Sequence, residues 1–150
     1  TDALFCAVYN RQLENHRDYF MSHLPELPAD LQGRIKKSLE LSLNWMRDER
    51  VVRVLFIEGM AGSTQVSTMY HNSLQQQAMA TAQLIRLDNP TIRLADEVLL
   101  QIAQAINGAY ASLVAQWMRS GYATPMDVMV EGCGLIVRGI MQQLLTHLAE

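Results

Sequence analysis

The side chains that most often carry catalysis or bind metals are few in this chain and lie far apart. Its 150 residues include four histidines and two cysteines, and Cys6 and Cys133 do not have a metal-binding spacing. A di-iron bundle needs Glu-x-x-His motifs, and zinc needs clustered His, Cys or carboxylate ligands. The sequence contains neither pattern, and it has no G-x-S-x-G elbow, P-loop or G-x-G-x-x-G motif. We therefore expect no enzymatic activity, no metal and no cofactor.

The two cysteines leave two alternatives open. A disulfide between Cys6 and Cys133 is one, but buried reduced thiols are favoured and fit a cytoplasmic protein. The segment Gly132-Cys133-Gly134 suggests a reactive thiol, although glycines within a helix more often permit close helix packing. The start of the chain lacks a charged segment followed by an apolar core, so no signal peptide is expected.

Composition and charge exclude several classes of protein. The chain is 49% hydrophobic and 18% charged with a net charge of -3, which predicts one compact domain over residues 1–150 and not a disordered chain. The chain has 12 basic and 15 acidic residues, and because DNA binding needs an excess of positive charge, the chain alone is not expected to bind DNA. The longest apolar uncharged run, Val98 to Met118, carries too many amides for a lipid-facing span, so we expect no membrane association.

Apolar bulk mixed with neutral polar groups points to a ligand-binding cavity. No formally charged residue occurs between Gly59 and Ile85, a stretch rich in Met, Gln, Ser and Thr. Such a lining suits a small, mostly apolar molecule held by a few amides and hydroxyls. The candidate ligand-binding residues are Trp45, Phe56, Met60, Met69, Tyr70, Leu74, Ile106, Asn107, Tyr110 and Val114. The alternative is that they are ordinary core residues, and for His16 we favour a satisfied core histidine over a ligand contact.

Helices are expected to position these residues. Apolar spacing predicts a helix from Thr1, a good N-cap, to about Leu24, and a second from Pro28 to Met46 with Asp30 in its first turn. The segment Val51 to Ile57 has β-propensity, but a single strand would leave its backbone unpaired, so we expect a short helix ending at Gly59. The fourth helix is expected from about Thr64 to Leu87, after a turn and cap at residues 62–64.

The last two helices have the clearest boundary signals. One is expected from about Leu94 to Arg119, with Gly121 as its terminating glycine. The other is expected to begin with Thr124 as N-cap and Pro125 at the first position, and to run to the end of the chain. The prediction is an all-α fold, an orthogonal bundle of about six helices.

The composition of these last two helices also predicts that the chain forms a homodimer. Both are apolar on more than one face, so both are expected to be buried on two sides. Small residues on each would allow the close approach of a second copy in a symmetric four-helix interface. The candidate dimer-interface residues are Ala109, Leu113, Trp117, Gly132, Ile136, Gly139, Ile140 and Gln143. The alternative is that both helices are central in a monomer.

The order of these segments resembles a known family. Residues 1–8 (TDALFCAV) are similar to the start of the long connecting helix that follows the recognition helix in tetracycline-repressor-like (TetR/AcrR) regulators. Residues 53–58 (RVLFIE) resemble the short sixth helix of that family, Leu99 to Trp117 its eighth helix and Pro125 to Leu148 its ninth. The resemblance spans the chain, but the N-terminal helix-turn-helix domain of the family is absent from it.

The resemblance implies a function. The chain would be the effector-binding and dimerisation domain of a bacterial transcriptional regulator, with its pocket among the first five helices and its dimer interface on the last two. A small hydrophobic effector would shift the connecting helix and change the spacing of two DNA-reading heads. Its partners would be a second copy, the effector and, through the absent N-terminal domain only, operator DNA. The alternative is a helical dimerisation or adaptor module with a solid core and no ligand.

Overall fold

The computed structural model describes residues 1–148, and over these residues the chain is all-α, as predicted. Its six main helical segments are α1 (Asp2–His23), α2 (Leu31–Trp45), residues 49–61, α5 (Thr64–Asp88), α6 (Asp96–Arg119) and α7 (Met126–Leu145). Residues 49–61 join α3 (Glu49–Val52), the π-helical η2 (Arg53–Glu58) and α4 (Gly59–Ala61). A short 3-10 turn, η1 (Leu24–Glu26), follows α1, and one isolated bridge pairs Ile92 with Leu148.

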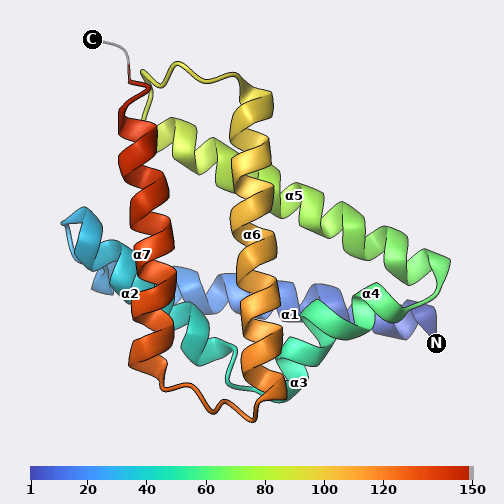
Figure 1. Cartoon of the computed structure of the whole chain (residues 1–150). Helices are drawn as coiled ribbons and strands as arrows, with labels where there is room; N and C mark the ends of the chain where they lie inside the picture. The colour runs from blue at the N-terminus through green and yellow to red at the C-terminus, as the bar shows by residue number, and fades with distance from the viewer. Residues whose placement is uncertain (149–150) are drawn as a thin grey trace.

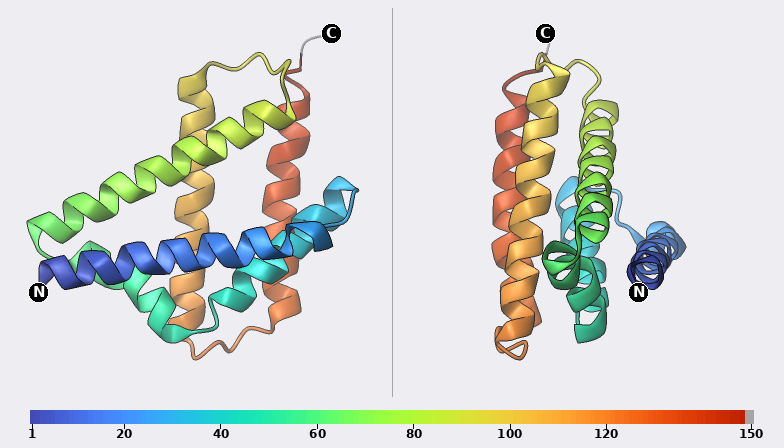
Figure 2. Two further views of the ribbon diagram at one scale, coloured as in Figure 1. Left: turned by 180° about the vertical axis from the view of Figure 1, so that it is seen from behind. Right: turned by 90° about the vertical axis from the view of Figure 1, so that its right-hand side faces the viewer.

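The helices are stacked in layers. In Figure 1, α6 and α7 run in opposite directions across the front of the molecule, and α1 and α5 cross behind them. The side view in Figure 2 places α2, α5 and residues 49–61 between the α6–α7 layer and α1. The outer faces of α6 and α7 therefore have no covering element, whereas the middle layer is covered on both sides.

The first helix boundaries agree with the sequence, and the second differs. Thr1 caps α1 by accepting a hydrogen bond from the Leu4 N–H, at 3.3 Å. The second helix does not begin at Pro28: Asp30 is its N-cap and accepts from the Gly33 N–H at 2.7 Å. An aspartate at this position satisfies a free N–H of the first turn, which fixes the start of α2 at the next residue.

The segment of residues 49–61 is helical, as predicted, and longer than expected. Its π-helical centre widens the backbone between α3 and α4. Gly59 begins α4 directly beneath the ring of Tyr70 from α5. A Cβ on Gly59 would lie 2.6 Å from Tyr70 Cδ2, so only glycine permits this contact without a shift of the ring.

The turn between α6 and α7 is held by its own hydrogen bonds. Gly121 has φ of +69°, which confirms it as the terminating glycine of α6, and Tyr122 follows with φ of 58°. The Tyr122 hydroxyl donates to the Met46 carbonyl oxygen at 2.9 Å. Thr124 does not cap α7, which begins after Pro125; its carbonyl instead accepts from the indole N–H of Trp117 at 2.8 Å.

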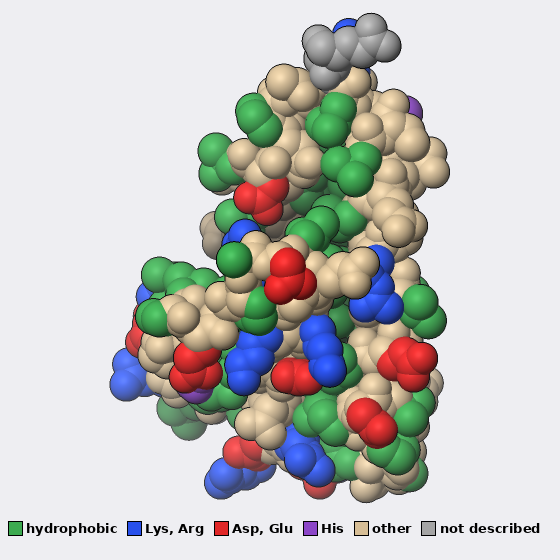
Figure 3. All heavy atoms as spheres, turned by 90° about the vertical axis from the view of Figure 1, so that its left-hand side faces the viewer, with side chains coloured by type: hydrophobic (Ala, Val, Ile, Leu, Met, Phe, Trp, Pro, Cys, Tyr) green, Lys and Arg blue, Asp and Glu red, His purple; other side chains and the backbone are tan. Residues whose placement is uncertain are grey.

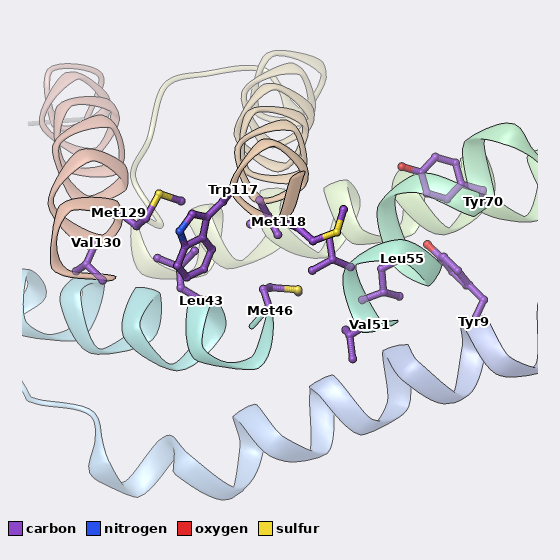
Figure 4. Close-up of a cluster of buried hydrophobic side chains, with 12 residues drawn as sticks. Tyr9, Leu43, Met46, Val51, Leu55, Tyr70, Trp117, Met118, Met129 and Val130 are labelled. Carbon is purple, nitrogen blue, oxygen red and sulfur yellow. The ribbon is translucent and has the colours of Figure 1, made fainter. Parts of the chain in front are cut away.

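The main core lies where α2, residues 49–61, α6 and α7 converge (Figure 4). Trp117 and Leu43 occupy its centre, and Tyr9 is the buried residue that α1 contributes. Its members are Tyr9, Leu43, Met46, Val51, Val52, Leu55, Tyr70, Val114, Trp117, Met118, Met129 and Val130. A second, smaller cluster joins the far ends of α5, α6 and α7: Ile85, Ile92, Leu99 and Leu144. Burying one such large apolar side chain is worth about 1.5–3 kcal/mol.

Candidate functional site

A groove between α5 and α6 brings together part of the predicted ligand-binding set. It has a volume of about 500 Å³ and is lined by Phe56, Met60, Tyr70, Leu74 and Asn107, all predicted from the sequence. The other lining residues are His71, Gln75, Gln104, Gly108, Ala111, Ser112, Ala115, Gln116 and Arg119. Small side chains on α6 leave this space open, since Gly108 and Ala111 face the larger Leu74 and Tyr70 of α5.

The polar groups of the groove are mostly neutral amides. Gln104 Nε2 donates to Gln75 Oε1 at 2.9 Å and so links α6 to α5. Asn107 Nδ2 lies 3.5 Å from Thr81 Oγ1, a long hydrogen bond that leaves the amide available to a stronger acceptor. Burial raises the pKa of Tyr70, with a smaller contribution from Tyr9, so its hydroxyl stays protonated. Such a surface can hold an apolar molecule and give it a few hydrogen bonds.

Arg119 and the small residues of this groove were missed by sequence reasoning. The sequence predicts Arg119 only as the last residue of a helix, a position where a basic side chain interacts favourably with the helix dipole. Gly108, Ala111 and Ala115 belong to the small residues that the sequence analysis interprets as surface for a second copy, and small residues are equally typical of a groove wall. The spacing of these residues shows that they share a face of α6, but not whether that face lines a groove or packs against another helix. That depends on where α5 lies in the fold.

Tyr110 and Val114 do not line the groove. Val114 is fully buried in the main core, and Tyr110 packs against that core with its hydroxyl hydrogen-bonded to Ser42 Oγ of α2. Burial raises the pKa of Tyr110 to about 12, and the Ser42 hydrogen bond opposes part of that rise. The space predicted as a cavity beside these two residues is therefore occupied by core side chains, which corrects that part of the prediction.

Two further candidates lie elsewhere. Met69 packs against the main core and also lines an open cleft between α1 and α5 with Leu13 and Asn72. Ile106 is half-buried on α6, outside the lining of the α5–α6 groove. The cleft beside Met69 is lined mostly by polar side chains and is separate from the α5–α6 groove.

Trp45 lies in an aromatic contact between α1 and α2. Its ring centroid is 4.8 Å from that of Tyr19 and 6.1 Å from that of His16. Trp45 Nε1 and His16 Nε2 are both buried and have no hydrogen-bond partner. Burial lowers the pKa of His16, so its imidazole is neutral near pH 7. The interpretation of His16 as a satisfied core histidine is wrong for this nitrogen.

Most candidate interface residues lie on the uncovered face of α6 and α7. Ala109, Leu113, Gly132, Ile136, Gly139 and Gln143 are exposed there, and Val128 and Leu135 extend the apolar surface. Ile140 is half-buried against the second cluster. Trp117 is the exception: it is 3% exposed in the main core, so it has no surface to offer a partner, and its assignment to the interface is corrected.

By length and composition alone, α6 and α7 are also apolar enough to cross a membrane. The same property is found in core helices of soluble proteins and is weak support for a span. Exposed amides, among them Gln101 and Gln116 on α6 and Gln143 on α7, would face lipid in such an arrangement. Each buried amide without a partner costs several kcal/mol in hydrocarbon, about 4–8 by transfer to cyclohexane.

The charged groups form no single-sign patch on the side of the molecule shown in Figure 3, where acidic and basic side chains are interspersed. An open cleft between α2 and α7 has the same character, since Lys36 and Arg138 line it together with Glu40, Asp127 and Glu131. Within residues 1–148, no three His, Cys, Asp or Glu side chains are grouped to hold a metal ion. Cys6 and Cys133 are free thiols in this structure.

No protein-family model matches the chain, and no curated protein or solved structure has significant similarity to it.

Proposed function

We propose that the chain is the ligand-sensing, dimerising domain of a TetR-like bacterial transcriptional regulator in the cytoplasm. It binds a small, mostly apolar effector that alters DNA binding by an N-terminal head outside these residues. The observation that carries this proposal is the α5–α6 groove, because an apolar surface with a few neutral amides is what such an effector needs. The all-α architecture and the order of the helices agree with the resemblance noted in the sequence.

Side-chain contacts also connect the groove to α1, the helix that would move. Tyr70 lines the groove, and its ring meets the ring of Tyr9 from α1 edge-on, with centroids 6.1 Å apart. Tyr9 is in turn hydrogen-bonded to Ser73 of α5 at 3.3 Å. A ligand that displaces Tyr70 would therefore act directly on the main buried anchor of α1. Regulation requires that the ligand bind the two positions of α1 unequally.

The groove is tested by filling it. Ala111→Trp places a large ring in the groove, and Ala80→Trp places the same ring on an exposed position of α5 outside it. In a thermal-shift screen of uncharged apolar compounds, a hit at a hundredfold excess over its Kd should stabilise the native chain by about 2.7 kcal/mol. We expect Ala111→Trp to abolish that shift and Ala80→Trp to retain it. A hit that survives Ala111→Trp would place the effector elsewhere.

A second copy of the chain is the proposed cover for the α6–α7 face. Gly132 and Gly139 lie within α7, and a Cβ at each would meet nothing within 4 Å. Glycine within a helix costs about 1 kcal/mol relative to alanine, and the single chain offers no packing reason for it at these positions. Close approach of a partner helix gives one. The exposed Leu113, Leu135 and Ile136 supply the apolar surface that such an interface would bury.

The interface is tested by charge. Gly139→Glu or Ala109→Glu would bring two like charges together across a two-fold axis, so light scattering should show a helical monomer where the native chain is a dimer. Ala80→Glu, exposed on α5, is the matched control and should remain dimeric. A dimer of unchanged strength in Gly139→Glu and Ala109→Glu would place the contact elsewhere. If the native chain is instead recovered as a monomer bound to membrane lipid, a membrane role for α6 and α7 would be favoured.

The second candidate function is a helical dimerisation or adaptor module without a ligand. The packing of Tyr110 and Val114 favours it, because the interior of the domain is filled there and not hollow. The two functions give different results in the same screen. An adaptor would dimerise and show the charge effects above, but no compound would stabilise it through the α5–α6 groove.

A further inference from the structure

One face of α6 lines the α5–α6 groove along most of the length of the helix. The α6 residues of this face recur every three or four positions, which places them on one side of the helix. They are Gln104, Asn107, Gly108, Ala111, Ser112, Ala115, Gln116 and Arg119. From Asn107 to Arg119 the face is roughly 18 Å long, because an α-helix rises about 1.5 Å per residue. The groove is therefore elongated and suits an extended molecule.

The two ends of this face differ in their chemistry. At one end the Gln104 amide donates to Gln75 Oε1 at 2.9 Å and ties α6 to α5. Between the ends, the small side chains of α6 lie opposite apolar side chains of α5 and of residues 49–61. Arg119 stands at the other end, and among the described residues it is the formally charged side chain that lines the groove. The groove thus has a neutral polar end, a mostly apolar middle and a cationic end.

Arg119 has no partner for its charge within residues 1–148, where it forms neither an ion pair nor a side-chain hydrogen bond. Glu49 and Arg53 share an adjoining cleft with it. The Glu49 carboxylate is already held there by Arg53, with Nε at 2.7 Å and Nη2 at 2.6 Å. The end of a helix favours a cation, but it gives the five N–H donors of a guanidinium no anion to bind. These three side chains therefore leave one positive charge unbalanced.

We propose that the ligand of the α5–α6 groove is a small amphipathic monocarboxylate, with its carboxylate on Arg119 and its apolar chain along Ala115 and Ala111. A guanidinium fits a carboxylate because two parallel N–H groups bind its two oxygens. The Gln116 amide, one turn earlier on the same face, offers a further donor. A dianionic phosphate fits less well, since its second charge would meet no cation and would approach Glu49. The ligand class so defined rests on the proposed function, which places the effector in this groove.

Decanoate and decanol are a matched pair of probes, because they share one apolar chain and differ in the charge at its end. Each is shorter, when fully extended, than the face from Asn107 to Arg119. Isothermal titration calorimetry below the micelle concentration of decanoate gives the Kd of both probes. The chains compared are the native one, Arg119→Gln and Arg34→Gln. Arg34 is exposed on α2 outside the groove, so Arg34→Gln is the control with the same change of net charge.

We expect Arg119→Gln to weaken decanoate binding about fivefold and to leave decanol binding unchanged, because only the carboxylate pairs with the guanidinium. Fivefold corresponds to about 1 kcal/mol, the upper end for an exposed ion pair. Arg34→Gln should change neither Kd. Added salt should weaken decanoate binding to the native chain more than to Arg119→Gln, since salt screens exposed charges. Arg119 is itself exposed, so Arg119→Gln should fold as the native chain does.

Three results would overturn the ligand class: no binding of decanoate to the native chain, equal weakening of both probes by Arg119→Gln, or equal effects of Arg119→Gln and Arg34→Gln on decanoate. The filled groove of Ala111→Trp separates this failure from that of the proposed function. If Ala111→Trp abolishes decanol binding while Arg119→Gln leaves decanoate unchanged, the groove binds an apolar ligand and only its acidic class is wrong. If decanoate binding survives Ala111→Trp, the ligand lies elsewhere and both fail.

Discussion

The two tryptophans of this chain lie in regions that are built in different ways. Trp117 is 3% exposed at the centre of the main core, packs edge-on against Tyr122 and donates its indole N–H to Thr124. Trp45 is half-buried between α1 and α2, and its N–H has no partner. In the first region, the tryptophan ring is packed and its indole N–H is hydrogen-bonded. In the second region, Trp45 Nε1 and the neighbouring His16 Nε2 are buried without a hydrogen-bond partner, a state that is uncommon in native proteins.

The same difference separates α1 from the rest of the domain. Tyr9 is the buried residue of α1, and the Ser63 hydroxyl donates to the Asp2 carboxylate at 2.6 Å near the start of the helix. The half that carries His16 and Tyr19 is held mainly by tilted aromatic contacts. One half of α1 is thus anchored to α5 and the other half rests on α2. A helix held in this way needs to break few polar contacts to change its angle, which is what the proposed movement of α1 requires.

The largest expected effect tests the first region. Trp117→Ala should destabilise the fold by about 3–5 kcal/mol, because it removes a large buried ring and leaves a cavity. Trp45→Ala should cost clearly less, since that ring is partly exposed and lies at the edge of the core. Urea unfolding followed by circular dichroism measures both. Equal losses would contradict the contrast between the two regions.

Gly59→Ala tests whether the groove wall belongs to the tightly built region. The new Cβ would lie 2.6 Å from the Tyr70 ring, and Tyr70 is itself buried against Tyr9. Overpacking of this kind costs about 1–3 kcal/mol. Gly108→Ala, on the groove wall of α6 with nothing within 4 Å of the added Cβ, is the matched control. It should be neutral or slightly stabilising, since alanine favours a helix. A neutral Gly59→Ala would mean that Tyr70 moves freely.

Replacing each tryptophan with phenylalanine separates the contribution of the indole N–H from that of the aromatic ring. Trp117→Phe leaves the Thr124 carbonyl without its donor, so it should lose about 1 kcal/mol more than the ring volume alone explains. Trp45→Phe removes a donor that has no partner, so the lost volume is partly offset and little net destabilisation is expected. Paired measurements of the free energy of unfolding give the difference. A larger loss for Trp45→Phe would show that its N–H is satisfied in solution.

Particular residues show how far the sequence could go. The helices and most of their ends could be predicted, because caps such as Thr1 and terminators such as Gly121 act through the local backbone. The start of α2 shifted, since Asp30 and Pro28 give competing signals. Helix α7 also differs: it begins at Met126 without a threonine cap and ends at Leu145, short of the predicted end. The site was harder to predict. Tyr110 and Asn107 share a face of α6, but the depth of each depends on α5 and α2, and no periodicity in α6 contains that information.

The absence of partners for His16 and Trp45 could not be read from the sequence either. Satisfaction of a buried group depends on atoms from several helices within about 3 Å, which composition and spacing do not encode. The local signals in the sequence determine each helix and its faces, but not the neighbours of those faces. What lies across from each surface is a tertiary property, and it is there that the functional hypotheses for this chain are decided.

The smallest expected effect is a dependence of stability on pH that comes from His16. Burial lowers the pKa of His16 in the fold below its ordinary value of 6.5, so the unfolded chain binds a proton more readily. Its contribution to stability is therefore complete above pH 6.5 and is lost as the pH falls towards the lower pKa of the folded state.

We expect the Tm to fall between about pH 7.5 and about pH 5.5, and His16→Phe to reduce that fall. His147→Phe, at an exposed position, should leave it unchanged. An identical pH dependence in the native chain and His16→Phe would show that His16 is not protected from protonation, and that α1 does not hold it against Trp45 in solution.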